Sequence, residues 1–300
     1  MKNSTLTGGI LVAIGAASYG MLTTFVKLAE RDGVNIYEIT LTEYIIGALG
    51  LFIADYLFHK RENKKTYPKP STRNIRNLML AGATMGSTTL LYYLTVQYVS
   101  VSVAIVLLMQ SVWIGVLIDA VLNKIRPDRL KLFAVVVVLA GTVLATNLLL
   151  VDTQLDWRGI ALGLLAAISY SITIFATNKI ALNLSTTTRS KYMMLGALIL
   201  VLIITTPFLI GNFNIRVLYT WGIFFGVFGA LLPPLLLNYG MPKVNLGVGA
   251  IITSMELPVA VALAYFILNE KVTGFQLLGI ALIIVAVIVM NLREIKQGRK

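Results

Sequence analysis

Apolar residues occur in long runs along this chain, and charged residues fall between those runs. No Asp, Glu, Lys or Arg occurs between Arg76 and Asp119, or between Arg216 and Lys243. A run of about 20 apolar residues is long enough for a helix to cross the hydrocarbon core of a bilayer. The pattern predicts ten membrane-spanning helices, at residues 7–26, 36–58, 76–95, 101–122, 130–149, 158–178, 191–211, 217–239, 245–268 and 273–292.

Composition supports a polytopic membrane protein and excludes several classes of function. Hydrophobic residues make up 57% of the 300 residues and charged residues 13%, with a mean hydropathy of +0.84. A soluble domain carries about 25% charged residues. The chain has no cysteine and one histidine, His59, so thiol chemistry and a histidine-based metal site are not expected. No nucleotide-binding or metalloprotease motif is present, and we expect neither an enzyme nor a resident cofactor.

The net charge of +12 comes from basic residues in the connections between the apolar runs, so we expect no nucleic-acid partner. If the N-terminus is cytoplasmic, 20 of the 25 Lys and Arg residues lie on the cytoplasmic side and 5 on the other. Cytoplasmic loops of membrane proteins are enriched in these residues. The pattern predicts an integral protein of the bacterial inner (plasma) membrane with cytoplasmic N- and C-termini.

Glu256 lies inside the ninth predicted span, two residues before Pro258. Counted from Asn245, it lies about 18 Å into the membrane, close to the middle of the hydrocarbon core. A carboxyl group at that depth is costly unless it faces a polar cavity, which favours a functional role. Gly249, Thr253 and Ala260 share its helix face and are small enough to line a cavity. The alternative is a structural hydrogen bond from a protonated Glu256 to a neighbouring helix.

An internal repeat relates the two halves of the chain. Residues 99–132 align with residues 244–277 at a constant offset of 145. Earlier positions match at slightly larger offsets: Glu43 with Lys191, and Ser18-Tyr19 with Ser169-Tyr170. Each copy, 1–150 and 151–300, holds five predicted spans. Because five is odd, the second copy is expected to be inverted in the membrane, an architecture found in alternating-access transporters. The predicted fold is therefore all-α, with ten transmembrane helices as two inverted five-helix repeats.

The chain resembles the EamA-type family of the drug/metabolite transporter superfamily. The second copy carries the closer resemblance, in Met255–Pro258, in Leu268–Lys271 and in Gln276–Gly279. The resemblance covers both halves and implies a central cavity lined mainly by the predicted spans 1, 3, 4, 6, 8 and 9. It also implies a small-molecule substrate such as an amino acid, usually exported. This chain departs from the family pattern where Glu43 and Lys191 replace an arginine that members often carry.

Polar and aromatic residues in the other predicted spans are candidates for the same cavity. Ser111 is the repeat partner of Glu256, and we expect it to face one cavity with Glu256, together with Gln110 and Trp113. Ordinary hydrogen bonds between helices are the alternative for Gln110 and Ser111, and contact with lipid is the alternative for Trp113. The full candidate binding set is Glu256, Thr253, Gln110, Ser111, Trp113, Tyr19, Tyr170, Tyr93 and Asn238.

Other features allow two interpretations each. Tyr93 and Asn238, near span ends, either line the cavity or, for the tyrosine, anchor the chain at the membrane surface. Pro233, Pro234 and Pro258 are candidate hinges, with a static kink as the alternative. The carboxylates at 43, 55 and 119 lie nearer to span ends, and we expect them to be solvated. Residues 27–32 are expected to form an exposed loop.

Together these features predict a secondary transporter that moves a small organic metabolite by alternating access. Glu256 would bind an amine of the cargo or exchange a proton, so coupling to protons stays open and no other cofactor is expected. The alternative is a non-transporting membrane protein, namely a sensor, an assembly factor or a lipid scramblase. The expected partners are the small-molecule substrate and the lipid bilayer, with the protein as a monomer or a homodimer.

Overall fold

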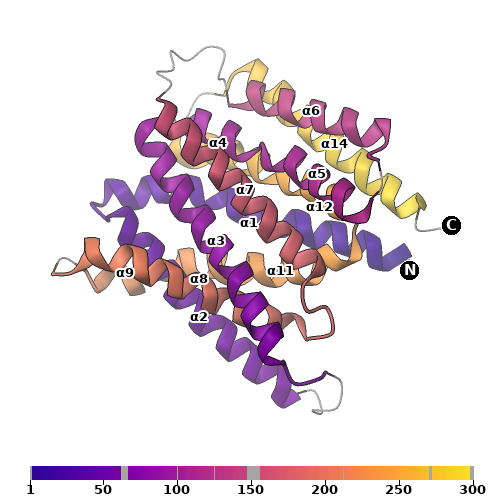
Figure 1. Ribbon diagram of the computed structural model, residues 1–300. Coiled ribbons are helices and arrows are strands. Elements are labelled where there is room, and N and C mark those ends of the chain that lie inside the picture. The colour runs from indigo at the N-terminus through magenta and orange to yellow at the C-terminus, as the bar shows by residue number, and fades with distance from the viewer. Residues whose placement is uncertain are drawn as a thin grey trace.

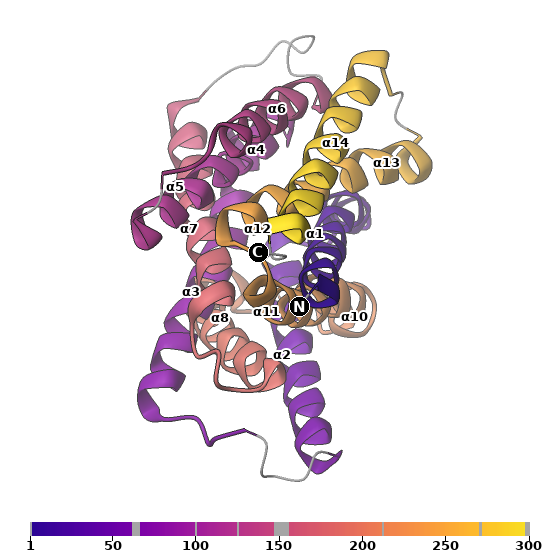
Figure 2. The same ribbon diagram turned by 90° about the vertical axis from the view of Figure 1, so that its right-hand side faces the viewer.

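The computed structural model describes residues 2–61, 67–99, 101–124, 126–146, 156–211, 213–269 and 272–297, and in these ranges it contains helices and no β-strand. The first half forms α1 (Lys2–Arg31), α2 (Ile36–Arg61), α3 (Thr72–Tyr98), α4 (Val101–Leu108), α5 (Ser111–Asn123) and α6 (Arg129–Ala145). The second half forms α7 (Trp157–Lys179), α8 (Thr186–Leu209), α9 (Arg216–Tyr219), α10 (Trp221–Phe225), η2 (Gly226–Leu231), α11 (Leu232–Gly240), η3 (Met241–Lys243), α12 (Leu246–Ile252), η4 (Thr253–Met255), α13 (Glu256–Leu268) and α14 (Gly274–Gln297). Helix α1 begins and α14 ends on the same side of the bundle (Figures 1 and 2).

Eight helical stretches in the described part of the chain are long and apolar enough to cross a membrane. They are Ser4–Arg31, Ile36–Phe58, Val103–Asn123, Trp157–Lys179, Thr186–Leu209, Trp221–Lys243, Leu246–Leu268 and Gly274–Glu294. The other two predicted spans correspond to α3, where Arg73, Arg76 and five threonines lower the hydropathy, and α6, which has only 17 residues. Length and composition therefore identify an integral membrane protein with eight candidate spans, and the count of ten stays a prediction.

Extensive helix contacts join the first half of the chain to the second. Helix α3 packs along α7 and α8, while α1 packs along α11 and α13, α2 along α8 and η2, and α6 along α14. When the two halves are aligned by the repeat, the contact of α3 with α8 corresponds to that of η2 with α2. Likewise, the contact of α3 with α7 corresponds to that of α11 with α1. The two halves thus interlock through equivalent contacts.

The helix is interrupted at the same place in both copies of the repeat. Helices α4 and α5 are separated by a turn at Met109 and Gln110, and α12 and α13 by the 3₁₀ turn η4. Helices α5 and α13 also end on a left-handed residue, Lys124 with φ 53° and its repeat partner Asn269 with φ 55°. The first copy has no proline at this interruption. A break at this place therefore forms without proline in the first copy. In the second copy Pro258 is the third residue of α13, directly after the break, and whether it acts as a hinge stays a prediction.

The predicted eighth span changes its backbone geometry twice. It begins as α10, passes through the π-helix η2, and continues as α11, with Pro233 and Pro234 as the second and third residues of α11. Prolines fit there because the first N–H groups of a helix have no partner within it. Single π-helical turns bend helices and are frequent at functional sites. Whether these prolines act as a hinge stays a prediction.

Glycines let α3 and α8 approach each other closely. A Cβ built on Gly82 would stand 1.6 Å from the carbonyl oxygen of Met193, and one on Gly196 would stand 2.0 Å from that of Met79. Small residues at such contacts are typical of helix pairs in membranes, where dispersion between closely packed backbones drives association. The Gly82/Gly86 pair in the sequence therefore marks a tight contact between the halves.

Candidate functional site

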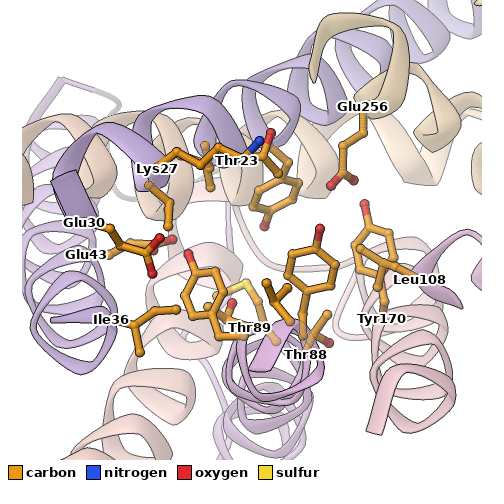
Figure 3. A pocket seen from close by; sticks show the side chains of 17 residues that line it. Thr23, Lys27, Glu30, Ile36, Glu43, Thr88, Thr89, Leu108, Tyr170 and Glu256 are labelled. Atoms are coloured by element: carbon orange, nitrogen blue, oxygen red, sulfur yellow. The ribbon is translucent and has the colours of Figure 1, made fainter. Parts of the chain in front are cut away.

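A cavity lies between helices from both halves, and Glu256 and Glu43 point into it from opposite sides (Figure 3). It encloses about 990 Å³ including its opening. Its lining is mostly apolar and aromatic, and it comes from α1, α2, α3, α4, α7 and α13. The lining residues are Tyr19, Leu22, Thr23, Val26, Lys27, Glu30, Ile36, Glu43, Met85, Thr88, Thr89, Tyr92, Tyr93, Val96, Leu108, Tyr170 and Glu256.

The cavity reaches one end of the bundle and stops inside it. Lys27, Glu30 and Ile36 line it where α1 turns into α2, and Glu30 is exposed there. Leu108 and Glu256 line it at the helix interruptions of the fourth and ninth predicted spans. The opening therefore lies at the end of the bundle opposite the start of α1 and the end of α14.

Glu256 lines this cavity, as the sequence analysis expected. It is the first residue of α13, directly after the 3₁₀ turn, and its side chain is partly buried. Its carboxylate and the hydroxyl of Tyr170 point toward one another across the cavity (Figure 3). Its main-chain carbonyl packs against Gly20 of α1, where an added Cβ would stand 2.2 Å from the oxygen. The turn before α13 and this contact together fix where the carboxylate enters the cavity.

Glu43 lies in the same cavity, and the expectation that water solvates it is wrong. Its side chain is 2% exposed, and its Oε2 atom has no hydrogen-bond partner. Its Oε1 atom lies against Gly229 of η2, where an added Cβ would come within 2.4 Å. Position along the span suggested contact with water, but the bulk of α1 and η2 encloses the carboxylate. A buried carboxylate without a partner is costly, so it favours a functional role.

Four tyrosines form the aromatic part of the lining. The rings of Tyr19 and Tyr170, which are repeat partners, meet edge to face with centroids 6.4 Å apart. The rings of Tyr92 and Tyr93 are 6.2 Å apart. Tyr19, Tyr170 and Tyr93 belong to the predicted set, which leaves out Tyr92 although the same two interpretations, cavity lining or surface anchor, apply to it. Tyrosine faces can attract a cation or stack on an apolar ligand.

Gln110, Ser111 and Trp113 do not share this cavity, which corrects the expectation from the repeat. Trp113 is 41% exposed on the outside of the bundle, and its Nε1 donates to Oε1 of Gln110 at 2.9 Å. Gln110 in turn donates from Nε2 to the carbonyl of Val106 in its own span. Ser111 is fully buried, and its carbonyl accepts a hydrogen bond from Ser171. The side chains of Gln110 and Trp113 thus bond to each other and to their own span, and Oγ of Ser111 is buried without a hydrogen-bond partner in the described structure.

Thr253 and Asn238 are buried outside the lining. Thr253 Oγ1 donates to the carbonyl of Ala250 in its own helix, one turn before Glu256. Asn238 Nδ2 donates to Oγ of Ser190 in α8 at 3.0 Å. Both side chains are 1% exposed, so they support the helices around the cavity. A direct contact of either with cargo stays a prediction.

Two residues at the mouth were also missed. The sequence predicted an exposed loop at 27–32, but α1 continues to Arg31 and brings Lys27 and Glu30 to the lining. A helical continuation was readable from the spacing of Tyr19, Thr23 and Lys27, which are four residues apart and so share one helix face. The first predicted span ended at residue 26, so Lys27 was not considered with the helix.

Polar contacts between the halves close the other end of the bundle. Asp55 of α2 forms an ion pair with Lys191 of α8, and it accepts hydrogen bonds from Thr187 and Thr188 at 2.8 Å each. This corrects the expectation of a solvated Asp55 and shows a partner from the other half of the chain. The side chains of His59 and Lys60, which follow Asp55 closely in the sequence, lie outside the described residues. The pair holds α2 to α8.

A second contact at the closed end connects α6 to the start of α12. Lys131 Nζ lies 3.1 Å from Oδ2 of Asp119 and donates to Oδ1 of Asn245 at 2.9 Å. Asp119 is 6% exposed, so the expectation that it is solvated is wrong as well. Arg293 and Asp128 form a more exposed pair between the same halves, with a contact of 2.6 Å. These contacts join residues of the two copies at the end where α1 begins.

Arg189 adds an inner set of hydrogen bonds at the closed end. Its guanidinium is 2% exposed and donates to three main-chain carbonyls, those of Thr177, Ile180 and Asn238, at 2.6, 3.0 and 2.7 Å. The carbonyls of Thr177 and Ile180 lie at the end of α7, and that of Asn238 belongs to α11. One side chain therefore joins α7, α8 and α11 below the cavity. Among the described residues, no group of three or more His, Cys, Asp or Glu is placed to hold a metal ion.

Comparisons with known proteins agree with this architecture. The EamA-like transporter family matches residues 6–147 and residues 157–292, one match for each half. One known crystal structure, described only as that of a protein, has a TM-score of 0.78 to this structure at 13% sequence identity. The match covers 97% of this chain and 98% of the other, and at this identity it shows a shared fold alone. A search of curated proteins finds no match.

Proposed function

Because this chain belongs to the EamA-like transporter family, we propose that it is a secondary transporter of a small organic metabolite that carries an amine, a class that includes amino acids. The observation that carries the proposal is the cavity, open at one end of the bundle and closed at the other by contacts between the halves. A binding site reached from one side at a time is the essential requirement of alternating access.

The proposed architecture is ten membrane-spanning helices in two inverted five-helix copies, 1–150 and 151–300. Equivalent helix pairs across the halves and equivalent interruptions in α4–α5 and α12–α13 support it. With both termini in the cytoplasm, as the basic connections predict, the cavity opens away from the cytoplasm. The proposed cycle would close that opening and open the end held by Asp55 and Lys191. We propose export as the direction of net transport.

Glu256 is proposed to bind the amine of the cargo or to exchange a proton with it. Its carboxylate enters the cavity opposite Tyr170, in surroundings that are otherwise largely apolar (Figure 3). In a low-dielectric site a charge-assisted hydrogen bond to an ammonium group is strong. The enclosed cavity also supports transport over the alternative of a lipid scramblase, which would need a polar groove open to lipid.

The test uses purified protein reconstituted into vesicles loaded with a candidate solute. A transporter shows saturable counterflow of labelled solute, and Glu256→Gln should abolish that flux or remove its dependence on pH while the folded yield stays the same. Asp156→Asn is the matched control, because Asp156 is a carboxylate outside the cavity that caps α7. Flux through Glu256→Gln with unchanged rate and pH dependence would remove this residue from the mechanism.

A further inference from the structure

The cavity contains two carboxylates on opposite walls rather than one. Glu43 enters from α2 and Glu256 from α13, and both point inward (Figure 3). Apolar and aromatic residues, including Leu22, Val26 and Met85, make up most of the remaining lining. A ligand that fills the cavity therefore meets an anionic group at each side and an apolar surface between them.

The charge of the lining selects the class of ligand. Of the ionisable side chains that line it, Glu30, Glu43 and Glu256 are acids and Lys27 is the base, so acids outnumber bases. Glu30 lies at the mouth, and Glu43 and Glu256 are the acids deeper in the cavity. A zwitterion would bring its own carboxylate close to one of them, and like charges in such a site repel. Two positive groups would instead match both acids.

The unpaired oxygen of Glu43 is an independent indication of a ligand. This side chain is 2% exposed, and its Oε2 atom has no hydrogen-bond partner in the described structure. Buried polar atoms without a partner are rare in folded proteins and call for an explanation such as a ligand group. An ammonium group carries three donors and would satisfy this oxygen.

We infer that the cavity binds an organic dication, in which two ammonium or guanidinium groups flank a short apolar spacer. One cationic group pairs with Glu256 beside Tyr170, and the other pairs with Glu43 beside Gly229. The spacer lies among the tyrosine rings. The faces of these rings also attract the cationic groups on either side of the spacer. This inference rests on the proposal that the cavity is the transport site, and it narrows the cargo of that site.

Three ligands of equal chain length separate a dication from its alternatives: α,ω-diaminopentane, pentylamine and aminopentanoate. Binding of each to the purified protein is measured by direct competition against labelled diaminopentane in detergent. We expect diaminopentane to bind about tenfold tighter than pentylamine or more, because one additional ion pair of about 1.4 kcal/mol corresponds to that factor. Aminopentanoate should bind weakest, because its carboxylate meets an acidic wall.

Variants of the two acids then test the assignment of each end. Both Glu43→Gln and Glu256→Gln should keep the affinity for pentylamine within a few fold and lose most of the preference for diaminopentane. Retained pentylamine binding separates loss of an ion pair from loss of folding, and Glu43→Asp, which keeps the charge, should retain part of the preference. Asp156→Asn, outside the cavity, should behave as the wild type.

The results separate this inference from the proposed function. Equal affinity for diaminopentane and pentylamine in the wild type would overturn the dication, and so would a preference that survives in both glutamine variants. Saturable counterflow of another solute, with no binding of diaminopentane, would also overturn the dication while leaving transport supported. Binding of diaminopentane without counterflow of it in vesicles would support the site and count against transport.

Discussion

Gly20 of α1 lies against the main-chain carbonyl of Glu256, so closely that a Cβ at position 20 would stand 2.2 Å from the oxygen. The repeat places Ser171 at the position of Gly20 and Ser111 at that of Glu256. In this equivalent contact between the copies, Oγ of Ser171 donates to the carbonyl of Ser111 at 3.2 Å. The carbonyls of Glu256 and Ser111 both lie at a helix interruption, and equivalent residues contact them. Gly20 contacts the first by close packing, and Ser171 contacts the second by a hydrogen bond.

Gly20→Ala should destabilise the protein and displace the carboxylate of Glu256. Forcing extra atoms into a packed interior costs about 1–3 kcal/mol, and here the neighbour is backbone, which cannot rotate away. The measurement is the apparent melting temperature in detergent, together with counterflow. Gly274→Ala is the matched control, since a Cβ there would have no heavy atom within 4 Å. Equal melting temperatures for the two variants would mean that the α1–α13 contact is looser than described.

The ion pair between Asp55 and Lys191 should contribute more to stability than the pair between Asp128 and Arg293. The side chains of Lys191 and Asp55 are 16% and 8% exposed, whereas those of Arg293 and Asp128 are 27% and 43% exposed. Removing one partner of a buried pair costs roughly 3–5 kcal/mol, and an exposed pair is worth roughly 0.2–1 kcal/mol.

A double-mutant cycle measures that difference. Asp55→Asn, Lys191→Met and the double variant are unfolded thermally in detergent, alongside Asp128→Asn, Arg293→Gln and their double variant. The coupling between Asp55 and Lys191 should exceed the other by at least twofold. A coupling near zero would indicate that Thr187 and Thr188, which donate to the same carboxylate, hold α2 to α8 without the lysine.

Arg189→Lys should destabilise the closed end despite keeping the positive charge. The guanidinium reaches three carbonyls that lie in different directions, on Thr177, Ile180 and Asn238. An ammonium group is compact and cannot satisfy all three from one position, and each buried carbonyl left without a donor costs about 1–3 kcal/mol. Thermal unfolding should show this loss, and an unchanged melting temperature for Arg189→Lys would show that water or repacking satisfies these carbonyls.

Much of the fold was predictable from the sequence, because membrane insertion imposes a simple rule on it. Apolar runs located the helices, and the offset of 145 aligns the turn at Met109 and Gln110 with η4, and Lys124 with Asn269. Packing contacts do not follow this rule. The pairing of Asp55 with Lys191 joins residues 136 positions apart, and no local pattern indicates it.

For the candidate site, the sequence indicated where residues lie along their helices better than it indicated which way their side chains point. Helical spacing and the repeat predicted that Glu256, Tyr19 and Tyr170 line one cavity, and all three line it. Trp113 aligns with Pro258 in the repeat, yet Trp113 is exposed whereas Pro258 is buried, so the alignment does not determine whether a side chain faces the interior. The burial of Glu43 was missed because it depends on packing against Gly229 of η2, which the position of Glu43 along its own helix does not indicate.

The absence of cysteine from the sequence allows the direction of the opening to be measured with single-cysteine variants. Thr88→Cys, in the cavity, and Gly274→Cys, at the start of α14, should both react with a membrane-impermeant maleimide from the side away from the termini. Asn123→Cys, at the end of α5, should react only from the side of the termini. Labelling of Thr88→Cys only from that side would show that the described opening faces the cytoplasm.

Asp128 should make the stability of the closed end depend on pH only in acid. Partial burial alone would raise the pKa of Asp128, but the hydrogen bond from Arg293, the Lys131 main-chain N–H and the positive charges nearby outweigh burial and lower the pKa below its ordinary value of about 3.9. A carboxyl whose pKa is lower in the folded state stabilises the fold above the unfolded pKa. That stabilisation is lost as pH falls through the folded pKa.

The comparison of wild type with Asp128→Asn isolates this effect, because asparagine can still cap α6 while it lacks the charge. The wild type should be more stable by roughly 0.2–1 kcal/mol at neutral pH, the range of exposed ion pairs. The difference should be constant well above the unfolded pKa of about 3.9, should shrink as pH falls through the lower folded pKa, and should disappear once the carboxyl is protonated in both states. Thermal unfolding across that range measures it. A difference that grew in acid would mean that the charge of Asp128 destabilises the fold, and Arg293 would then not be its dominant partner.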